Sequence, residues 1–120
     1  MPPRRIEDAD GIAALAAVRQ GSTARPALAT AVRWSLQRLA DAAPGNSVEV
    51  RVPPFAAVQA VPGPRHTRGT PPNVVETDAT TWLALATGAL TWDEAVAQSR
   101  VSASGSRADL TAFLPVRLDV

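Results

Sequence analysis

The amino-acid sequence predicts an α+β fold in a single domain. Three observations support this prediction: the length of 120 residues, the helical spacing of apolar residues in the N-terminal part, and short strand patterns between helices in the rest of the chain. A chain of this length buries about two-thirds of its unfolded surface, which suffices for one core. We therefore expect one domain over residues 1–120, in which residues 1–22 form an N-terminal helix or a separate arm.

Two helices are predicted before residue 44. Asp10 can cap the first helix, and Gly21 is a typical stop just past its end. A second helix begins near Pro26, a residue that the first helical turn tolerates. Its apolar residues form one stripe with helical spacing: Leu28, Val32, Leu36, Leu39 and Ala43. Trp34 lies off this stripe, four residues before Arg38, so we consider stacking of the guanidinium on the indole ring.

The apolar period then changes to two, which is typical of strands. Valines alternate with charged residues over 48–52, so one face of this strand should be buried. Residues 55–61 are apolar at both alternating sets of positions except at Gln59, which predicts a strand covered on both faces, or one that faces a helix layer and a ligand. Residues 62–72 are rich in proline and glycine and read as a long hairpin connection to a third strand over 73–77.

Cap residues define two further helices. Asp78 can cap a helix over about 79–87, and Gly88 is its stop. Thr91 and Glu94 have the spacing of a capping box, in which the threonine side chain and the glutamate side chain each accept a backbone N–H. The second of these helices should therefore be short and end near residue 98.

The remaining elements complete one helix layer on a sheet. Trp92 should be half exposed in the first turn of its helix. A strand over 100–104 follows, and Ser106 can cap a last helix that Pro115 ends. The order predicts a mainly antiparallel sheet of four to five strands with helices on one face. The two helices before the last strand form a crossover, which would make the sheet mixed.

Composition excludes several classes of protein. No apolar stretch approaches the roughly 18 residues of a membrane helix, and acidic residues stand where a signal peptide has its apolar segment. With no cysteine and one histidine, disulfides and a histidine-based metal site are not expected. A net charge of +1 is too close to neutral for a protein that binds nucleic acid through a basic face. We expect a cytoplasmic protein without membrane insertion, metal or nucleic acid.

Residues 73–115 show an order of elements and motifs that is found in a known protein family. A strand there is followed by Asp78, a helix with the pair Trp82-Leu83, and Gly88, and then by a short helix, a strand and a last helix. This order resembles the C-terminal half of the sterol carrier protein family, the small lipid-binding domain of type-two carriers. Ser99 stands where that family prefers glycine, and the loop over 65–72 resembles a bacterial, actinobacterial-type branch of orthologues.

The resemblance implies a sterol-carrier-like fold with an apolar cavity between sheet and helices, for a fatty acyl chain, a sterol or a similar ligand, and no cofactor. A core rich in alanine and valine has few large side chains, so either its elements pack closely or an apolar cavity remains. Large apolar side chains are the candidate ligand-binding residues, with a plain core role as the alternative: Phe55, Val58, Trp82, Leu83, Leu85, Leu90 and Phe113.

The loop over residues 62–72 is the candidate headgroup site. Arg65, His66 and Arg68 bring two permanent positive charges and one titratable group together, while prolines stiffen both ends of the loop. Arginine holds a carboxylate or a phosphate with two hydrogen bonds. The alternatives are a protein contact, or ion pairs that fix the loop on nearby carboxylates: Glu76, Asp78 and Asp93.

These observations predict non-catalytic binding or carrying of a hydrophobic small molecule, fatty acyl or lipid-like, with an acidic head. The alternative function is a protein-interaction or regulatory module with the same fold and a filled core, for which a protein partner or a dimer is expected. A catalytic interpretation has His66 as a base oriented by Glu76 or Asp78. No nucleophile elbow, phosphate loop or metal-ligand spacing supports it.

Overall fold

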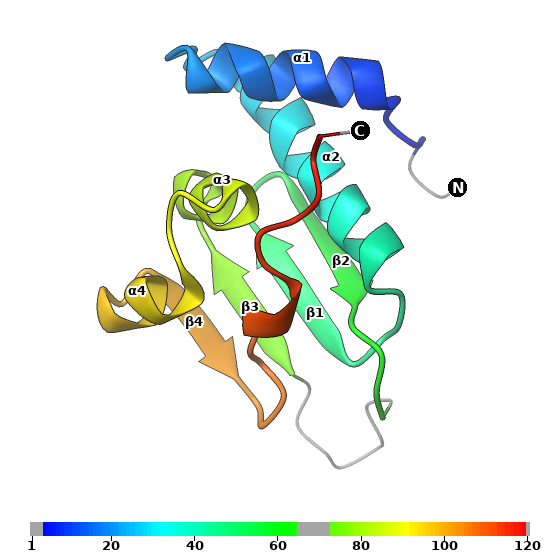
Figure 1. Ribbon diagram of the computed structural model, residues 1–120, viewed down its shortest axis with the longest axis vertical. Coiled ribbons are helices and arrows are strands. Elements are labelled where there is room, and N and C mark those ends of the chain that lie inside the picture. Colours follow the sequence, from blue (N-terminus) through cyan, green and yellow to red (C-terminus); the bar gives the residue numbers. More distant parts are fainter. Residues whose placement is uncertain (1–3, 65–72, 120) are drawn as a thin grey trace.

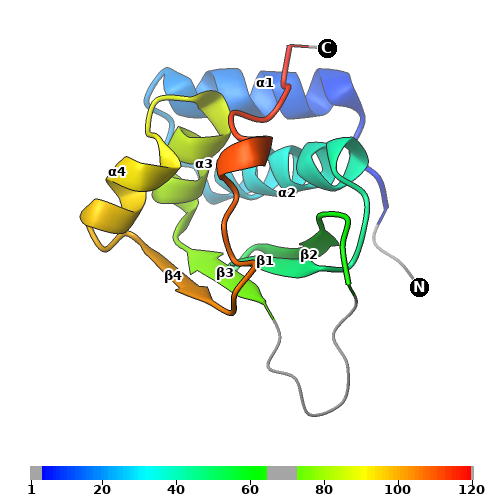
Figure 2. The same ribbon diagram turned by 60° about the horizontal axis from the view of Figure 1, so that its bottom comes forward.

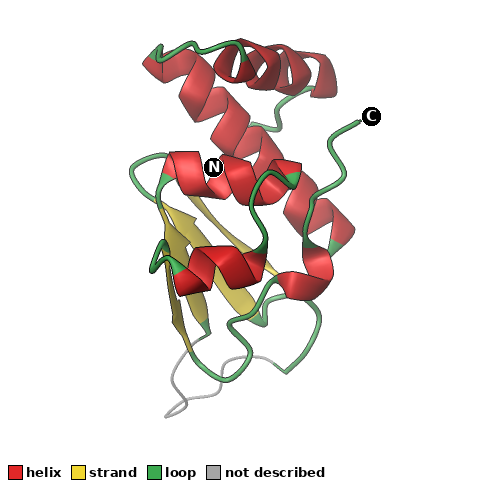
Figure 3. Cartoon of the chain, turned by 60° about the vertical axis from the view of Figure 1, so that its left-hand side comes forward, coloured by secondary structure: helices red, strands yellow, loops and turns green. Residues whose placement is uncertain are grey.

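The computed structural model describes residues 4–64 and 73–119 (Figure 1). These residues form the predicted α+β fold. Its elements follow the chain in the order α1 (Asp8–Arg19), α2 (Arg25–Ala42), β1 (Val48–Val52), β2 (Ala56–Ala60), β3 (Val74–Thr77), α3 (Ala79–Thr87), α4 (Trp92–Ala97), β4 (Val101–Ser104) and the 3₁₀ turn η1 (Thr111–Phe113). The prediction of helices on one face of one sheet is confirmed (Figure 3).

The four strands lie in the order β2-β1-β3-β4. β1 is antiparallel to β2 and parallel to β3, and β3 is antiparallel to β4, so the sheet is mixed. The alternation over residues 48–52 buries all three valines of β1, as its period predicts. Figure 2 shows α2 and α3 over one face of the sheet and α1 outside α2, and no described helix covers the other face.

Two expectations about the connections are wrong. β2 and β3 flank β1, so residues 62–72 do not join a hairpin. The parallel pair is β1 with β3, and the two helices before the last strand do not produce it. The chain leaves β3 at Thr77 and returns beside it at Val101, because α3 and α4 together lead out from the sheet and back to the same end. An excursion of this kind gives an antiparallel neighbour.

β2 is covered on one face only, so the prediction of a strand buried on both faces is wrong. Ala57 and Gln59 are exposed, whereas Val58 is half-buried and Ala60 is buried. Alanine counts as apolar in a sequence pattern, but its side chain is small enough to stand exposed at little cost. A strand with alanine on both parities therefore looks more buried in the sequence than it is in the structure.

The caps of α3 and α4 are confirmed. The Asp78 carboxylate accepts the Thr81 N–H at 2.8 Å, and Gly88 ends α3 at φ +85°. Both hydrogen bonds of the predicted capping box at the start of α4 are present. Trp92, however, is only 6 % exposed, because α4 lies against the main core, so its predicted half exposure is wrong. Ser99, in the position where glycine is preferred, has φ +55°, a conformation that glycine adopts without strain.

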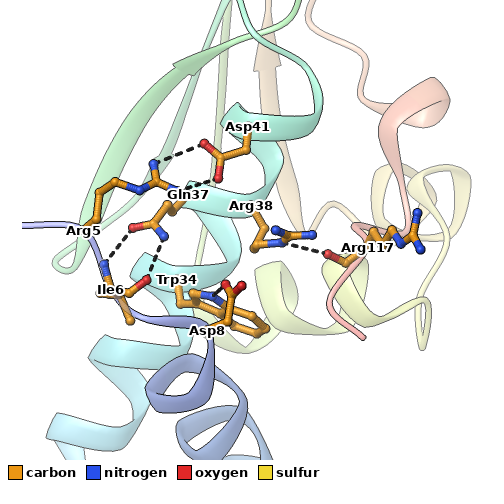
Figure 4. Close-up of polar contacts among 8 residues, drawn as sticks. All are labelled: Arg5, Ile6, Asp8, Trp34, Gln37, Arg38, Asp41 and Arg117. Atoms are coloured by element: carbon orange, nitrogen blue, oxygen red, sulfur yellow. Dashed lines mark hydrogen bonds and ion pairs between the residues drawn. The ribbon is translucent and has the colours of Figure 1, made fainter. Parts of the chain in front are cut away.

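Trp34 is fully buried between α1 and α2, contrary to its predicted stacking on Arg38. Its Nε1 donates to Asp8 Oδ1 at 3.0 Å, while Arg38 Nε donates to the Arg117 carbonyl at 3.1 Å (Figure 4). A Cβ at Gly11 would lie 2.1 Å from the Trp34 ring, so this glycine leaves room for the indole. The helix α2 is covered by α1 as well as by the sheet, and its buried surface is wider than one stripe.

The two ends of the chain also differ from expectation. The helix α1 begins at Asp8 after Glu7, and Asp10 lies in its first turn and is not its cap. The predicted last helix is reduced to η1. Asp109 accepts the Thr111 N–H at 2.8 Å, and this local hydrogen bond competes with helical pairing. Ser106 caps no helix.

Candidate binding groove

The predicted ligand-binding residues do not share one site. Four of them are buried: Trp82, Leu83, Leu85 and Leu90. The indole Nε1 of Trp82 donates to Ser35 Oγ at 2.8 Å, and that hydroxyl lies 2.8 Å from the Ala31 carbonyl of α2. The apolar ring of Trp82 thus packs within the core, and its one polar atom is hydrogen-bonded there. A role for these four side chains as ligand contacts stays a prediction.

Phe55, Val58 and Phe113 are half-buried at the border of the core. Phe55 and Val58 line a groove of about 800 Å³ along β2, which we name the β2 groove. Its three walls are the N-terminal segment (residues 4–6), the outward side of α2 from Thr30 to Asp41, and residues 55–58. It lies at the outer edge of the sheet, away from the space beneath Trp82.

Polar contacts hold the N-terminal segment on α2 (Figure 4). The Ile6 N–H donates to Gln37 Oε1 at 3.0 Å, and Gln37 Nε2 donates to the Ile6 carbonyl at 2.9 Å. Arg5 donates two hydrogen bonds to Asp41, at 2.7 and 3.2 Å. These bonds lower the pKa of the Asp41 carboxyl and raise the pKa of the Arg5 guanidinium. The segment therefore forms a defined wall of the β2 groove.

Arginines border the apolar residues of the opposite wall. Arg33 Nε donates to the Phe55 carbonyl at 3.1 Å. The guanidinium of Arg25 stands 5.3 Å from the centre of the Phe55 ring, within the range of a cation–π contact. Within the described part of the chain, neither terminal nitrogen of Arg33 makes a hydrogen bond or an ion pair. These donors are available to a ligand in the groove.

The β2 groove combines apolar and cationic surface. Ile6, Phe55 and Val58 provide apolar atoms. Arg4 and Arg33 provide positive charge. Asp41 does not neutralise it, because its carboxylate is already paired with Arg5. The volume falls in the range of about 300–1,000 Å³ typical of small-molecule sites. An elongated molecule with an acidic group at one end satisfies both kinds of surface.

Sequence reasoning found Phe55 and Val58 but missed the rest of the groove. Arg33, Gln37 and Asp41 stand on the polar side of the second helix, which is all that their spacing shows. The predicted headgroup residues Arg65, His66 and Arg68 lie outside the described residues.

A second depression, of about 360 Å³, lies near β3 and β4 and includes Glu76, Asp78 and Arg100. In residues 4–64 and 73–119, no three metal-binding side chains come close enough to hold an ion, and no helix is long and apolar enough to cross a membrane.

The fold and the groove define a small α+β domain with an open amphipathic groove. Residues 24–116 match the family model described as bacterial SCP ortholog. This match covers most of the chain, so the chain belongs to this family of bacterial orthologues of sterol carrier protein. A search of the curated proteins found no match. The matched residues include α2 and the whole sheet, whereas α1 and the N-terminal segment precede them.

Proposed function

We propose that this protein binds and carries a hydrophobic small molecule with an acidic group, without catalysing a reaction, and that the β2 groove is its site. One observation carries the proposal: the half-buried side chains of Phe55 and Val58 line a groove of about 800 Å³ together with Arg33, whose terminal nitrogens have no partner among the described residues. Membership in the sterol carrier family supports a hydrophobic cargo.

The chemistry of the two ends of such a ligand supports this site. Each methylene that an acyl chain buries against Phe55 and Val58 contributes about 0.8 kcal/mol before the costs of binding. Arg33 uses Nε for the Phe55 carbonyl, and the two terminal nitrogens remain to hold a carboxylate or phosphate oxygen. The ligand's acidic group would therefore lie at Arg33 and its chain along residues 55–58.

A fluorescent fatty acid whose emission depends on its surroundings tests this proposal on the full chain. We expect saturable binding that weakens about ten-fold, or by about 1.4 kcal/mol, in both Arg33→Gln and Phe55→Ala. Arg19→Gln is the matched control, because it removes the same charge from α1 outside the groove. Binding that is equal in all four proteins would contradict the proposal.

The corresponding fatty alcohol, used as a competitor of the probe, separates the two ends of the ligand. It should bind the unaltered protein more weakly than the fatty acid does, because it has no charge for Arg33 to hold. In Arg33→Gln the two competitors should bind about equally. A constant difference between acid and alcohol would show that the acidic group is held elsewhere.

A protein-interaction module with a filled core is the second candidate function. The observation in its favour is that Trp34 and Trp82 are fully buried and that both ring N–H groups are hydrogen-bonded within the protein. Native mass spectrometry of freshly purified protein separates the candidates, since a carrier retains bound lipid-like mass. A partner site would instead lie on the surface.

A further inference from the structure

The outer edge of β2 carries backbone groups that pair with nothing among residues 4–64 and 73–119. The Glu49 N–H donates to the Asn73 carbonyl, on the β3 side of β1. Since backbone groups alternate along a strand, those of Val50 face β2. In the register of these strands, the N–H and C=O groups of Ala57 and Gln59 then point away from β1. β2 thus presents a free pairing edge.

Within residues 56–60, this edge lacks three common protections against pairing with another chain. Natural edge strands are commonly blocked by charged residues, proline or a bulge. Residues 56–60 contain no charged residue and no proline, and their register with β1 is continuous. Ala57 and Gln59 are exposed, so a further strand can approach.

The charge beside the edge indicates the kind of strand that it takes. The β2 groove runs along residues 55–58, and the exposed Arg4 and Arg33 line it. Asp41, the acidic residue in its lining, is paired with Arg5. A second copy of this chain would bring the same arginines against these, and like charges repel. A strand with acidic side chains would complement them.

We infer that the outer edge of β2 binds an extended peptide segment that carries acidic side chains. The peptide backbone pairs with the free groups of Ala57 and Gln59, as in β-strand addition, and its carboxylates meet Arg33 and Arg4. This inference goes beyond the carrying of a small molecule. Because residues 55–58 line both sites, the peptide and an amphiphile in the groove exclude each other.

The probe is an acetylated and amidated hexapeptide that alternates valine and glutamate, titrated into the ¹⁵N-labelled full chain. We expect the amide signals of Ala57 and Gln59 to shift and their exchange with solvent to slow. The same peptide with lysine for glutamate should bind at least ten-fold more weakly. Equal binding of the two peptides, or shifts confined to other residues, would overturn the inference.

Backbone pairing can be tested by altering backbone N–H groups in the peptide and in the protein. N-methylation of the peptide at all valines or at all glutamates should abolish binding in one case only, because alternate N–H groups face β2. Ala57→Pro removes the outward N–H, which does not pair with β1, and should weaken binding at least ten-fold. Ala57→Ser keeps that N–H and should bind normally. If Ala57→Pro fails to fold, the methylated peptides carry the test.

Two further results would overturn the inference. Unchanged binding to Ala57→Pro, with both methylated peptides also bound, would show that the edge does not pair. Concentration-dependent dimers in sedimentation, dissolved by Ala57→Pro, with no peptide bound, would make a second copy the occupant. The fatty acid titration stands apart from these measurements. A protein that binds the probe but no peptide keeps the proposed function and loses only this inference.

Discussion

The packed interior on the two sides of α2 and the β2 groove at the edge of the sheet differ in how they are filled. In the interior, Trp34 and Trp82 are fully buried and their ring N–H groups are bonded. In the groove, Phe55 and Val58 stay half-buried beside exposed arginines. Two large tryptophans are therefore packed into the interior of a chain that is otherwise rich in small residues. The groove forms at the edge of the sheet.

The largest expected effect is a difference between the contributions of these two regions to the free energy of unfolding. Trp82→Ala should lower the free energy of unfolding by about 3–5 kcal/mol, because it empties a fully buried site. Phe55→Ala should lower it by about 1 kcal/mol, since that ring is only partly buried and already meets solvent. Urea denaturation of both variants measures the difference. Equal losses would show that the groove is as much a part of the core as the interior is.

A smaller effect tests whether the packed interior extends to α1. Gly11→Ala should destabilise the protein by about 1–3 kcal/mol, because the new Cβ would meet the buried Trp34 ring. Alanine otherwise favours a helix over glycine by about 1 kcal/mol. A stabilised Gly11→Ala would therefore mean that α1 does not pack on Trp34. Ala16→Ser, exposed on the same helix, is the control and should change stability by less than about 0.5 kcal/mol.

The smallest effect concerns the N-terminal wall of the groove. The pKa of Asp41 is lowered by its hydrogen bonds from Arg5, so the pair contributes fully above the ordinary carboxyl pKa of about 4. Its contribution is lost as the pH falls through the lowered value. Below about pH 4 we expect a smaller hydrogen-exchange protection factor at the Ile6 amide, with little change in Tm.

The variant Asp41→Asn is the control for this acid effect. It should show the lower protection at Ile6 already at neutral pH and little further change on acidification. Gln37 holds the Ile6 backbone and does not titrate, so the segment should loosen without leaving α2. The same Ile6 protection in Asp41→Asn and in the unaltered protein at neutral pH would show that the ion pair does not hold this wall.

Local features of the fold were predictable because short-range contacts produce them. Asp78, Gly88 and the Thr91–Glu94 box act within one helical turn, and all three are present. The parallel pairing of β1 with β3 depends on the course of the chain between them, which no local pattern shows. Trp34 was misplaced for a related reason: only the packing of α1 on α2 makes its side of the helix an interior one.

The candidate groove was predictable only in its apolar part. Phe55 and Val58 stand out in the sequence as large side chains in a strand of alanines. Nothing in the spacing shows that Arg33 and residues 4–6 meet them, since these segments lie far apart along the chain. Charged residues on the polar side of a helix look alike, whether they face open solvent or border a groove.

The three tryptophans give this protein its own optical probes. The chain has no tyrosine, so its near-ultraviolet emission comes from Trp34, Trp82 and Trp92. Each is buried in a different helix, α2, α3 and α4. With two of the three replaced by phenylalanine, the emission wavelength of the third reports when water reaches that helix alone. The order in which α2, α3 and α4 lose their packing then becomes visible without any added label.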